Sequence, residues 1–226
     1  MSRRYLALAA GLIMILTLPV TGNALTFQNG SFETPGIGSG NFLNLDATPS
    51  DSNYITGWEV FTGDIDYVKA WTASDGDYSI DLNGSTAGGI RQTFDTTPGL
   101  YYEVLFDMAA NPTASSMVAP PPTVTLTAST GSLTESYSFD SSLSTSYGNL
   151  GWTTYSYSFL ATDALTTLEF VSTTSGLNIN ATGPALDNVR VNATGPAPIP
   201  EPATILLIGT GIVGFAGTRI RKRLQK

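Results

Sequence analysis

Carboxylates are the main chemical resource of this chain of 226 residues, which contains neither histidine nor cysteine. Residues 25–197 hold 17 of the 18 acidic residues and only three basic ones, which gives that region a net charge of −14. The missing residue types exclude a Ser-His-Asp triad, a cysteine nucleophile, disulfides, and zinc sites with imidazole or thiolate ligands. The chemistry that remains is cation binding or hydrolysis by a pair of carboxyl groups.

The same charge balance argues against some partners. Between residues 25 and 197 the bases are Lys69, Arg91 and Arg190, which stand far apart in the sequence. Binding to phosphate groups needs clustered lysines and arginines. We therefore expect no nucleic-acid partner and no attraction of this region to anionic lipid.

One acidic motif starts like a calcium loop but departs from the EF-hand pattern. If Asp75 in "DGDYSIDLNGST" is position 1, Ile80 stands where the EF-hand needs glycine, and Thr86 stands where it needs glutamate. Asp64 and Asp66 share one face of an expected strand, and we interpret them as a pair that faces solvent.

Glu33 and Asp187 form a better candidate pair. Glu33 follows the first expected strand and Asp187 lies in the last one, and first and last strands commonly lie side by side in β-sandwiches. The alternative is that both are solvated turn residues.

Sugar binding would need an aromatic surface with polar neighbours. The chain has three tryptophans and ten tyrosines. Trp58, in "GWEV", is expected in the core. Trp71, beside "TASDGD", is the candidate for a ligand-binding ring, and whether it is exposed stays open.

Alternation with a period of two indicates strands along the whole middle of the chain. It is visible in "LYYEVLFDMAANP" (residues 100–112), in "YSIDLNG" (78–84), in "TVTLTAS" (123–129) and in "TYSYSF" (154–159). About ten or eleven such runs are separated by turn residues. The pattern predicts one all-β ectodomain over residues 25–193, an antiparallel β-sandwich of jelly-roll type. Residues 34–53 and 111–122 are expected to be long loops.

The N-terminus has the form of a secretory signal peptide. Arg3 and Arg4 precede an apolar stretch over residues 6–18, and the small-residue pattern ends at Ala24. We predict cleavage after Ala24, so that residues 1–24 are removed on export.

The C-terminus has the form of a membrane segment. A Pro-rich linker (residues 194–202) precedes an uncharged, glycine-rich run (203–218) and a basic end (219–226). At ~1.5 Å per residue the run is about 24 Å long as a helix, slightly short of a ~30 Å hydrocarbon core. We predict one transmembrane helix over 203–218 with its basic end in the cytoplasm.

This C-terminal sequence, "PIPEPATILLIGTGIVGFAGTRIRKR", resembles the PEP-CTERM sorting signal of Gram-negative bacteria through Pro200-Glu201-Pro202, the glycine-rich span and the arginine-rich end. The resemblance implies that an exosortase recognises the signal and cuts near the tripeptide. It also implies an association with exopolysaccharide and biofilm. Extended backbone around two prolines is a form that a processing enzyme can grip, so we expect a transient anchor.

The ectodomain resembles the choice-of-anchor C group and related galactose-binding-like β-sandwiches. The residues that carry this resemblance are "NGSFE" (29–33), "GWEVFTGDIDYV" (57–68), residues 79–112 and "GPALDNVRV" (183–191). The resemblance implies the sandwich fold and a structural calcium ion at Glu33 and Asp187. It says little about activity, because such folds serve many ligands.

Together these features predict an exported, non-catalytic protein of the cell surface or extracellular matrix. It would pass through an inner-membrane intermediate and would bind extracellular polysaccharide. Two alternatives stay open: a glycoside hydrolase or lyase that uses paired carboxylates, and a structural coat protein without a specific ligand.

Overall fold

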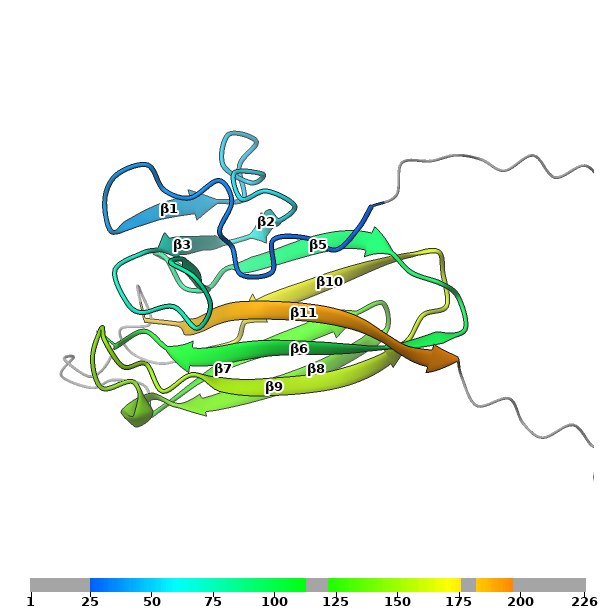
Figure 1. Cartoon of the computed structure of the whole chain (residues 1–226). Helices are drawn as coiled ribbons and strands as arrows, with labels where there is room; N and C mark the ends of the chain where they lie inside the picture. The colour runs from blue at the N-terminus through cyan, green and yellow to red at the C-terminus, as the bar shows by residue number, and fades with distance from the viewer. Residues whose placement is uncertain (1–24, 113–121, 176–181, 197–226) are drawn as a thin grey trace, which may run out of the picture.

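The computed structural model describes residues 25–112, 122–175 and 182–196, in which eleven strands form two sheets (Figure 1). The six-stranded sheet has the order β1-β3-β4-β11-β6-β9 and consists of β1 (Phe42–Asp46), β3 (Asp64–Val68), β4 (Ser79–Asp81), β11 (Pro184–Pro196), β6 (Leu100–Ala110) and β9 (Thr153–Leu160). The five-stranded sheet has the order β2-β5-β10-β7-β8 and consists of β2 (Glu59–Thr62), β5 (Gly89–Asp95), β10 (Leu165–Ser172), β7 (Thr123–Thr130) and β8 (Leu133–Asp140).

The topology confirms the predicted antiparallel sandwich. Neighbouring strands within the described ranges pair in antiparallel fashion in both sheets. In Figure 1, β11, β6 and β9 lie in front of β10, β7 and β8, so the sheets form two layers. The chain passes from one sheet to the other at most of its connections, as it does in a jelly roll.

The core lies between the sheets and follows from the alternation in the sequence. In β7, Val124 and Leu126 are fully buried, whereas Thr125 between them is only half-buried. In β6 the buried face includes Phe106, whose ring lies 5.0 Å from that of Phe170 in the opposite sheet, edge to face. Trp58 is 2% exposed, which confirms its predicted place in the core. Each such large side chain stabilises the fold by roughly 1.5–3 kcal/mol through loss of contact with water.

The N-terminal segment differs from the expectation. No strand precedes Glu33 in the described chain, and β1 lies inside the stretch that was predicted to be a loop over 34–53. Asn29 instead shapes a turn, since its amide donates to the carbonyl oxygens of Thr34 (2.7 Å) and Thr56 (2.9 Å). Gly30 packs against β11 so closely that a Cβ atom there would lie 1.9 Å from the Val189 carbonyl oxygen. Within the segment, the Gln92 side chain bonds the N–H (2.8 Å) and the carbonyl oxygen (2.9 Å) of Gln28, so side-chain hydrogen bonds take the place of strand pairing there.

Several sequence predictions fall outside the described residues. These are the signal peptide with Ala24, the Pro200-Glu201-Pro202 motif, the transmembrane helix over 203–218 and the basic end. Within residues 25–112, 122–175 and 182–196, no helix has the length and apolar character needed to cross a membrane.

Candidate functional site

The outer face of the six-stranded sheet carries a row of carboxylates, formed by Asp66, Asp81, Asp107 and Asp187. Asp66 of β3 is paired in register with Asp81 of β4, and Asp187 of β11 with Asp107 of β6. Directly paired residues have Cβ atoms roughly 4.5–5.5 Å apart. All four side chains are at most 9% exposed, because the loops around residues 69–78, 83–87 and 144–151 fold over this face.

Asp64 and Asp66 do not face solvent, which corrects the sequence interpretation. Asp64 is 7% exposed and accepts hydrogen bonds from the backbone N–H groups of Ser85 (2.8 Å) and Thr86 (2.6 Å). Burial alone would raise the pKa of Asp64, but these bonds and those from the Thr86 hydroxyl and Asn44 lower it. Burial raises the pKa of Asp66, whose hydrogen bond from Asn44 compensates only in part and whose neighbour Asp64 adds repulsion.

Asp81 lies at the centre of the row and is fully buried. Its carboxylate accepts hydrogen bonds from the backbone N–H groups of Asn83 (2.9 Å) and Gly183 (3.1 Å) and from the Asn111 amide (2.7 Å). Burial raises the pKa of Asp81 to about 7 despite these bonds, and the charge of Asp66 contributes in the same direction. This carboxyl group is therefore partly protonated near neutral pH.

A pocket of about 160 Å³ opens beside Asp66, and we call it the Trp71 pocket. Its lining comes from β1, β3, the loop after β3, the residue after β6 and the loop before β9, and comprises Phe42, Asp66, Val68, Ala70, Trp71, Asn111 and Tyr147. Its volume corresponds to about five water molecules at ~30 Å³ each. Phe42 is 57% exposed and Tyr147 is 50% exposed, so their rings are accessible at its rim.

Trp71 forms a wall of this pocket and is not its exposed platform. The side chain is only 7% exposed, and the indole N–H donates to the Ser79 hydroxyl at 2.7 Å. The backbone next to it is fixed, because Thr72 N–H donates to the Tyr147 carbonyl oxygen (2.8 Å) and the Trp152 indole N–H donates to the Thr72 carbonyl oxygen (3.0 Å). The pocket is thus held between two tied loops.

Glu33 and Asp187 contact one common loop, the segment between β3 and β4. Asp187 Oδ2 accepts hydrogen bonds from the N–H groups of Ser74 (2.7 Å) and Asp75 (2.9 Å). Glu33 Oε1 accepts from those of Asp77 (3.0 Å) and Tyr78 (2.9 Å). Each carboxylate thus binds the backbone N–H groups of two consecutive loop residues.

Between these contacts lies Gly76, which has a positive φ of 76°. A Cβ atom at Gly76 would lie 2.4 Å from the Glu33 carboxyl carbon, so only glycine allows this approach.

The chemistry of this loop fits a calcium ion in part. Asp187 is fully buried, and its pKa is raised to about 7, chiefly by burial and also by the charge of Asp75. Carboxylate oxygens are donors that calcium takes, and here those of Glu33 and Asp187 accept from N–H groups of the same turn. The described ranges contain no group of three or more acidic side chains placed to hold a metal ion, so backbone oxygens would have to supply most of the ligands.

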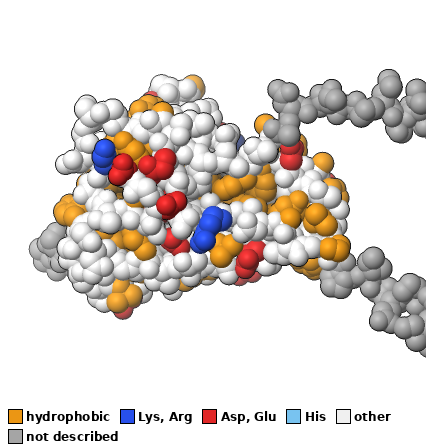
Figure 2. All heavy atoms as spheres, viewed as in Figure 1, with side chains coloured by type: hydrophobic (Ala, Val, Ile, Leu, Met, Phe, Trp, Pro, Cys, Tyr) orange, Lys and Arg blue, Asp and Glu red, His pale blue; other side chains and the backbone are white. Residues whose placement is uncertain are grey.

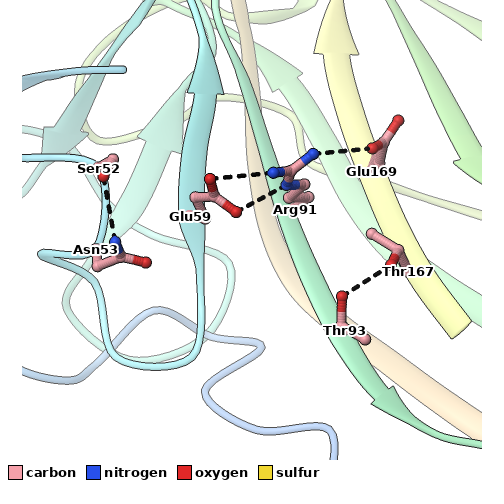
Figure 3. A network of polar contacts seen from close by, with 7 residues as sticks. All are labelled: Ser52, Asn53, Glu59, Arg91, Thr93, Thr167 and Glu169. Atoms are coloured by element: carbon pink, nitrogen blue, oxygen red, sulfur yellow. Dashed lines mark hydrogen bonds and ion pairs between the residues drawn. The ribbon is translucent and has the colours of Figure 1, made fainter. Parts of the chain in front are cut away.

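A second polar cluster lies on the five-stranded sheet and is centred on Arg91 of β5 (Figure 3). Its guanidinium group donates to both carboxylate oxygens of Glu59 on β2, at 2.8 and 3.1 Å, and lies 3.9 Å from Glu169 on β10. Arg91 and Glu59 border a shallow groove of about 290 Å³, the Arg91 groove, together with Trp58 and Asn53. Arg91 is one of the three bases between residues 25 and 197, and its sequence context did not indicate this role.

Comparison with known proteins assigns both parts of the chain. The family model described as a protein of unknown function (DUF642) matches residues 25–192, and the model of the PEP-CTERM protein-sorting motif matches residues 198–222. The chain belongs to the DUF642 family. The second match confirms the resemblance to the PEP-CTERM signal, which marks the protein for export.

Other similarities of this DUF642 chain are more distant. Halomucin of Haloquadratum walsbyi is 44% identical over 66 residues, which are 29% of this chain and 1% of halomucin. Among solved structures, TmCBM61 in complex with β-1,4-galactotriose is 16% identical, with 75% of this chain and 98% of that chain covered and a TM-score of 0.42. CBM35 from Paenibacillus barcinonensis is 15% identical, with 67% and 99% covered and a TM-score of 0.41. Similarity at this level does not transfer a ligand.

Sequence reasoning on the DUF642 domain found some of these residues and missed others. It named Trp71, Glu33 and Asp187, and the structure places all three around the loop between β3 and β4. It missed Asp81 and Tyr147. Alternation in "YSIDLNG" puts Asp81 on the face opposite Ile80, but no local signal shows that loops cover that face.

Proposed function

We propose that this protein is an exported, non-catalytic protein of the cell surface or matrix whose DUF642 domain binds a sugar unit in the Trp71 pocket. The observation that carries the proposal is the composition of that pocket. Accessible rings of Phe42 and Tyr147 stand at its rim, and the Asp66 carboxylate and the Asn111 amide belong to its lining.

The ligand that suits this pocket is a neutral sugar. The apolar C–H face of a pyranose packs against an aromatic ring, while carboxylates and amides bind its hydroxyl groups. A uronic acid or sulfated sugar would instead meet Asp66 and the net charge of −14 carried by residues 25–197. Neutral chains of an extracellular polysaccharide therefore suit the site.

The pocket's lining also supports binding without hydrolysis. Glycoside hydrolysis by carboxylates needs two such groups that flank the scissile bond. Of the residues that line the Trp71 pocket, Asp66 alone carries a carboxyl group, and its neighbour Asp81 is 0% exposed. The alternative of a hydrolase or lyase gains no support from this geometry.

The Arg91 groove is less suited to sugar. The Arg91 guanidinium group is already bound by Glu59, and the groove's aromatic residue, Trp58, is 2% exposed. We assign the Arg91 cluster to cross-strand stabilisation of β2, β5 and β10. Exposed ion pairs of this kind contribute roughly 0–1 kcal/mol.

We expect binding to a neutral oligosaccharide to weaken at least tenfold in Tyr147→Ala, because the ring that packs on the sugar is removed; tenfold corresponds to ~1.4 kcal/mol. Tyr147 is half exposed, so the substitution should leave the fold intact. The measurement is an array of neutral gluco-, galacto-, manno- and xylo-oligosaccharides, followed by calorimetry with the best binder. Arg91→Met is the matched control and should bind as the parent protein does.

The reverse pattern, with binding lost in Arg91→Met and kept in Tyr147→Ala, would move the site to the other sheet. Absence of binding across the array would favour a coat protein without a ligand. Release of reducing sugar that disappears in Asp66→Asn would make the protein an enzyme.

Export and processing form the second part of the proposal. The chain would enter the inner membrane through its C-terminal segment, be cut by an exosortase near Pro200-Glu201-Pro202, and reach the surface or the biofilm matrix. The start of the domain is suited to cleavage after Ala24. Leu25 N lies 2.6 Å from Asp95 Oδ2, so the new ammonium group would meet a carboxylate.

We expect the protein in the matrix fraction to begin at Leu25 and to end near Pro200, having lost the 26 residues beyond it, about 3 kDa. Intact-mass and terminal-peptide mass spectrometry measure both ends. A peptide "TRIRKRLQK" in the secreted form would contradict removal of the tail, whereas its accumulation only in an exosortase-deficient strain would support sorting.

A structural calcium ion at Glu33 and Asp187 is the third part of the proposal. It is supported by the burial of the Asp187 carboxylate, with which no lysine or arginine of the described chain forms an ion pair, and by the shared contact of both carboxylates with the loop between β3 and β4. The ion would fix the loop that also supplies Ala70 and Trp71 to the sugar pocket.

A further inference from the structure

Both ends of the described ectodomain lie at one end of the sandwich, which we call the terminal end (Figure 1). Leu25 exchanges hydrogen bonds with Asp95 at the end of β5, and Asp95 is paired with Leu165 at the start of β10. In the six-stranded sheet, Gly195 near the end of β11 is paired with Tyr101 of β6, which is in turn paired with Leu160 of β9. Segments far apart in the sequence thus meet where the chain leaves the domain.

The terminal end is apolar at its surface. Four large hydrophobic side chains are exposed there: Leu25 (48%), Tyr101 (36%), Leu160 (41%) and Leu165 (50%). Figure 2 shows hydrophobic side chains gathered on this part of the molecule. Leu160 and Leu165 also line a hollow of about 520 Å³ between the β7–β8 turn and the β9–β10 connection.

The charged residues of the terminal end argue against binding to phosphate groups. The residues that line the hollow include Asp163 and neither lysine nor arginine. Asp95 adds a second carboxylate nearby. Any contact with lipid there would depend on apolar burial and would not need anionic headgroups.

The length of the C-terminal linker decides what this end can reach. Six residues separate Pro196 from the uncharged run that starts at Ala203, and fully extended they span at most about 20 Å. The sandwich is longer than that, since the 11 residues of β6 extend over about 37 Å. With the tail in a bilayer, the terminal end is therefore held next to the lipid surface, and the Trp71 pocket at the opposite end is held away from it.

We infer that Tyr101, Leu160 and Leu165 rest on the phospholipid surface while the tail is still attached. The inference depends on the proposed membrane intermediate. Tyrosine and leucine suit the boundary between headgroups and acyl chains. Three side chains without a cationic partner bind lipid weakly by themselves, so contact relies on the tether, which raises the local lipid concentration. Removal of the tail then releases the domain as well as its anchor.

The test uses single cysteines, which this cysteine-free chain allows without further substitution. The full chain with its tail is reconstituted in phosphatidylcholine vesicles as Leu165→Cys or as Leu143→Cys. Leu143 is equally exposed, at 51%, but lies in the short helix η2 (Ser141–Leu143) at the opposite end. Quenching of a fluorophore on each cysteine by lipid-attached nitroxide is measured, together with the rate of reaction with a water-soluble maleimide.

We expect strong quenching at residue 165 and none at residue 143, and maleimide labelling at least about fivefold slower at residue 165. Flotation of the protein with the vesicles combined with equal quenching at both positions would overturn this inference and leave the proposed anchoring intact. Failure to float with the vesicles would overturn the membrane intermediate and the inference with it.

Discussion

Calcium at about 100 times its dissociation constant should raise the unfolding temperature of the ectodomain by about 5–10 °C. At that ratio a ligand of the folded state contributes ~2.7 kcal/mol, and for a domain of this size each kcal/mol corresponds to roughly 2–4 °C. The physical reason lies at Asp187, whose carboxylate is fully buried. The backbone N–H bonds from Ser74, Asp75 and Asn188 offset the cost of burial only in part, because the pKa of Asp187 is still raised to about 7. In the described chain no lysine or arginine forms an ion pair with Asp187 or with Glu33.

A second buried aspartate on the same face of the sheet, Asp81, provides the control for this prediction. Asp187→Asn should lose the calcium shift, whereas Asp81→Asn, at an equally buried aspartate outside the proposed site, should keep it. Thermal melts with calcium and with chelator are compared for the three proteins. An unchanged melt of the parent protein, or a calcium shift that survives in Asp187→Asn, would mean that these carboxylates only hold the loop.

The strands could be predicted from the sequence because each has one face in the core. In "TVTLTAS" the apolar residues Val124, Leu126 and Ala128 are all fully buried, and the intervening threonines are not. Alternation of this kind is a local property of the chain and survives in the fold. The segment before Glu33 could not be predicted in this way, because the Gln92 side chain, 64 residues along the chain, bonds both backbone groups of Gln28.

Only part of the candidate site could be predicted from the sequence, because the residues that form it lie far apart along the chain. Asp66 and Tyr147 line one pocket although 81 residues separate them, and Asp187 binds the backbone of Ser74 from 113 residues away. Such contacts follow from strand order and register, which local patterns do not specify. Asp64 and Asp66 illustrate this point, since their shared face was predicted correctly while the loop that buries it was not.

The stability of the calcium-free domain should fall as pH rises from about 4 to 7, and Asp81→Asn should remove much of that slope. The pKa of Asp81 is raised to about 7 by burial, compared with ~3.9 in an unfolded chain. Between these values the folded state binds a proton that the unfolded state has released. The stabilising contribution is therefore complete below pH ~4 and is lost as pH rises through about 7.

Two other carboxylates, Asp64 and Asp107, have the opposite effect on the pH dependence of stability and destabilise the fold at acid pH. Burial raises the pKa of Asp64 and of Asp107, but hydrogen bonds outweigh that effect and hold both pKa values below the usual range. Their contribution is present above the unfolded pKa of ~3.9 and disappears as pH falls through their lower folded values. Together with Asp81, they predict maximal stability in mildly acid solution.

Urea unfolding in the presence of chelator, repeated from pH 3 to 8, separates these effects. In Asp81→Asn the side-chain oxygen still accepts from Asn83 and Gly183, and the Asn111 amide turns its oxygen toward the new NH2 group. The variant should thus stay folded, with a clearly smaller slope between pH 5 and 8 and with the same loss below pH 4 as the parent protein. The slope that is left belongs to Asp187, whose pKa burial also raises to about 7, and to Asp66, whose pKa burial raises as well. A slope between pH 5 and 8 that is equal in both proteins would show that Asp81 does not hold the proton, and would place it on another buried carboxyl group of the row.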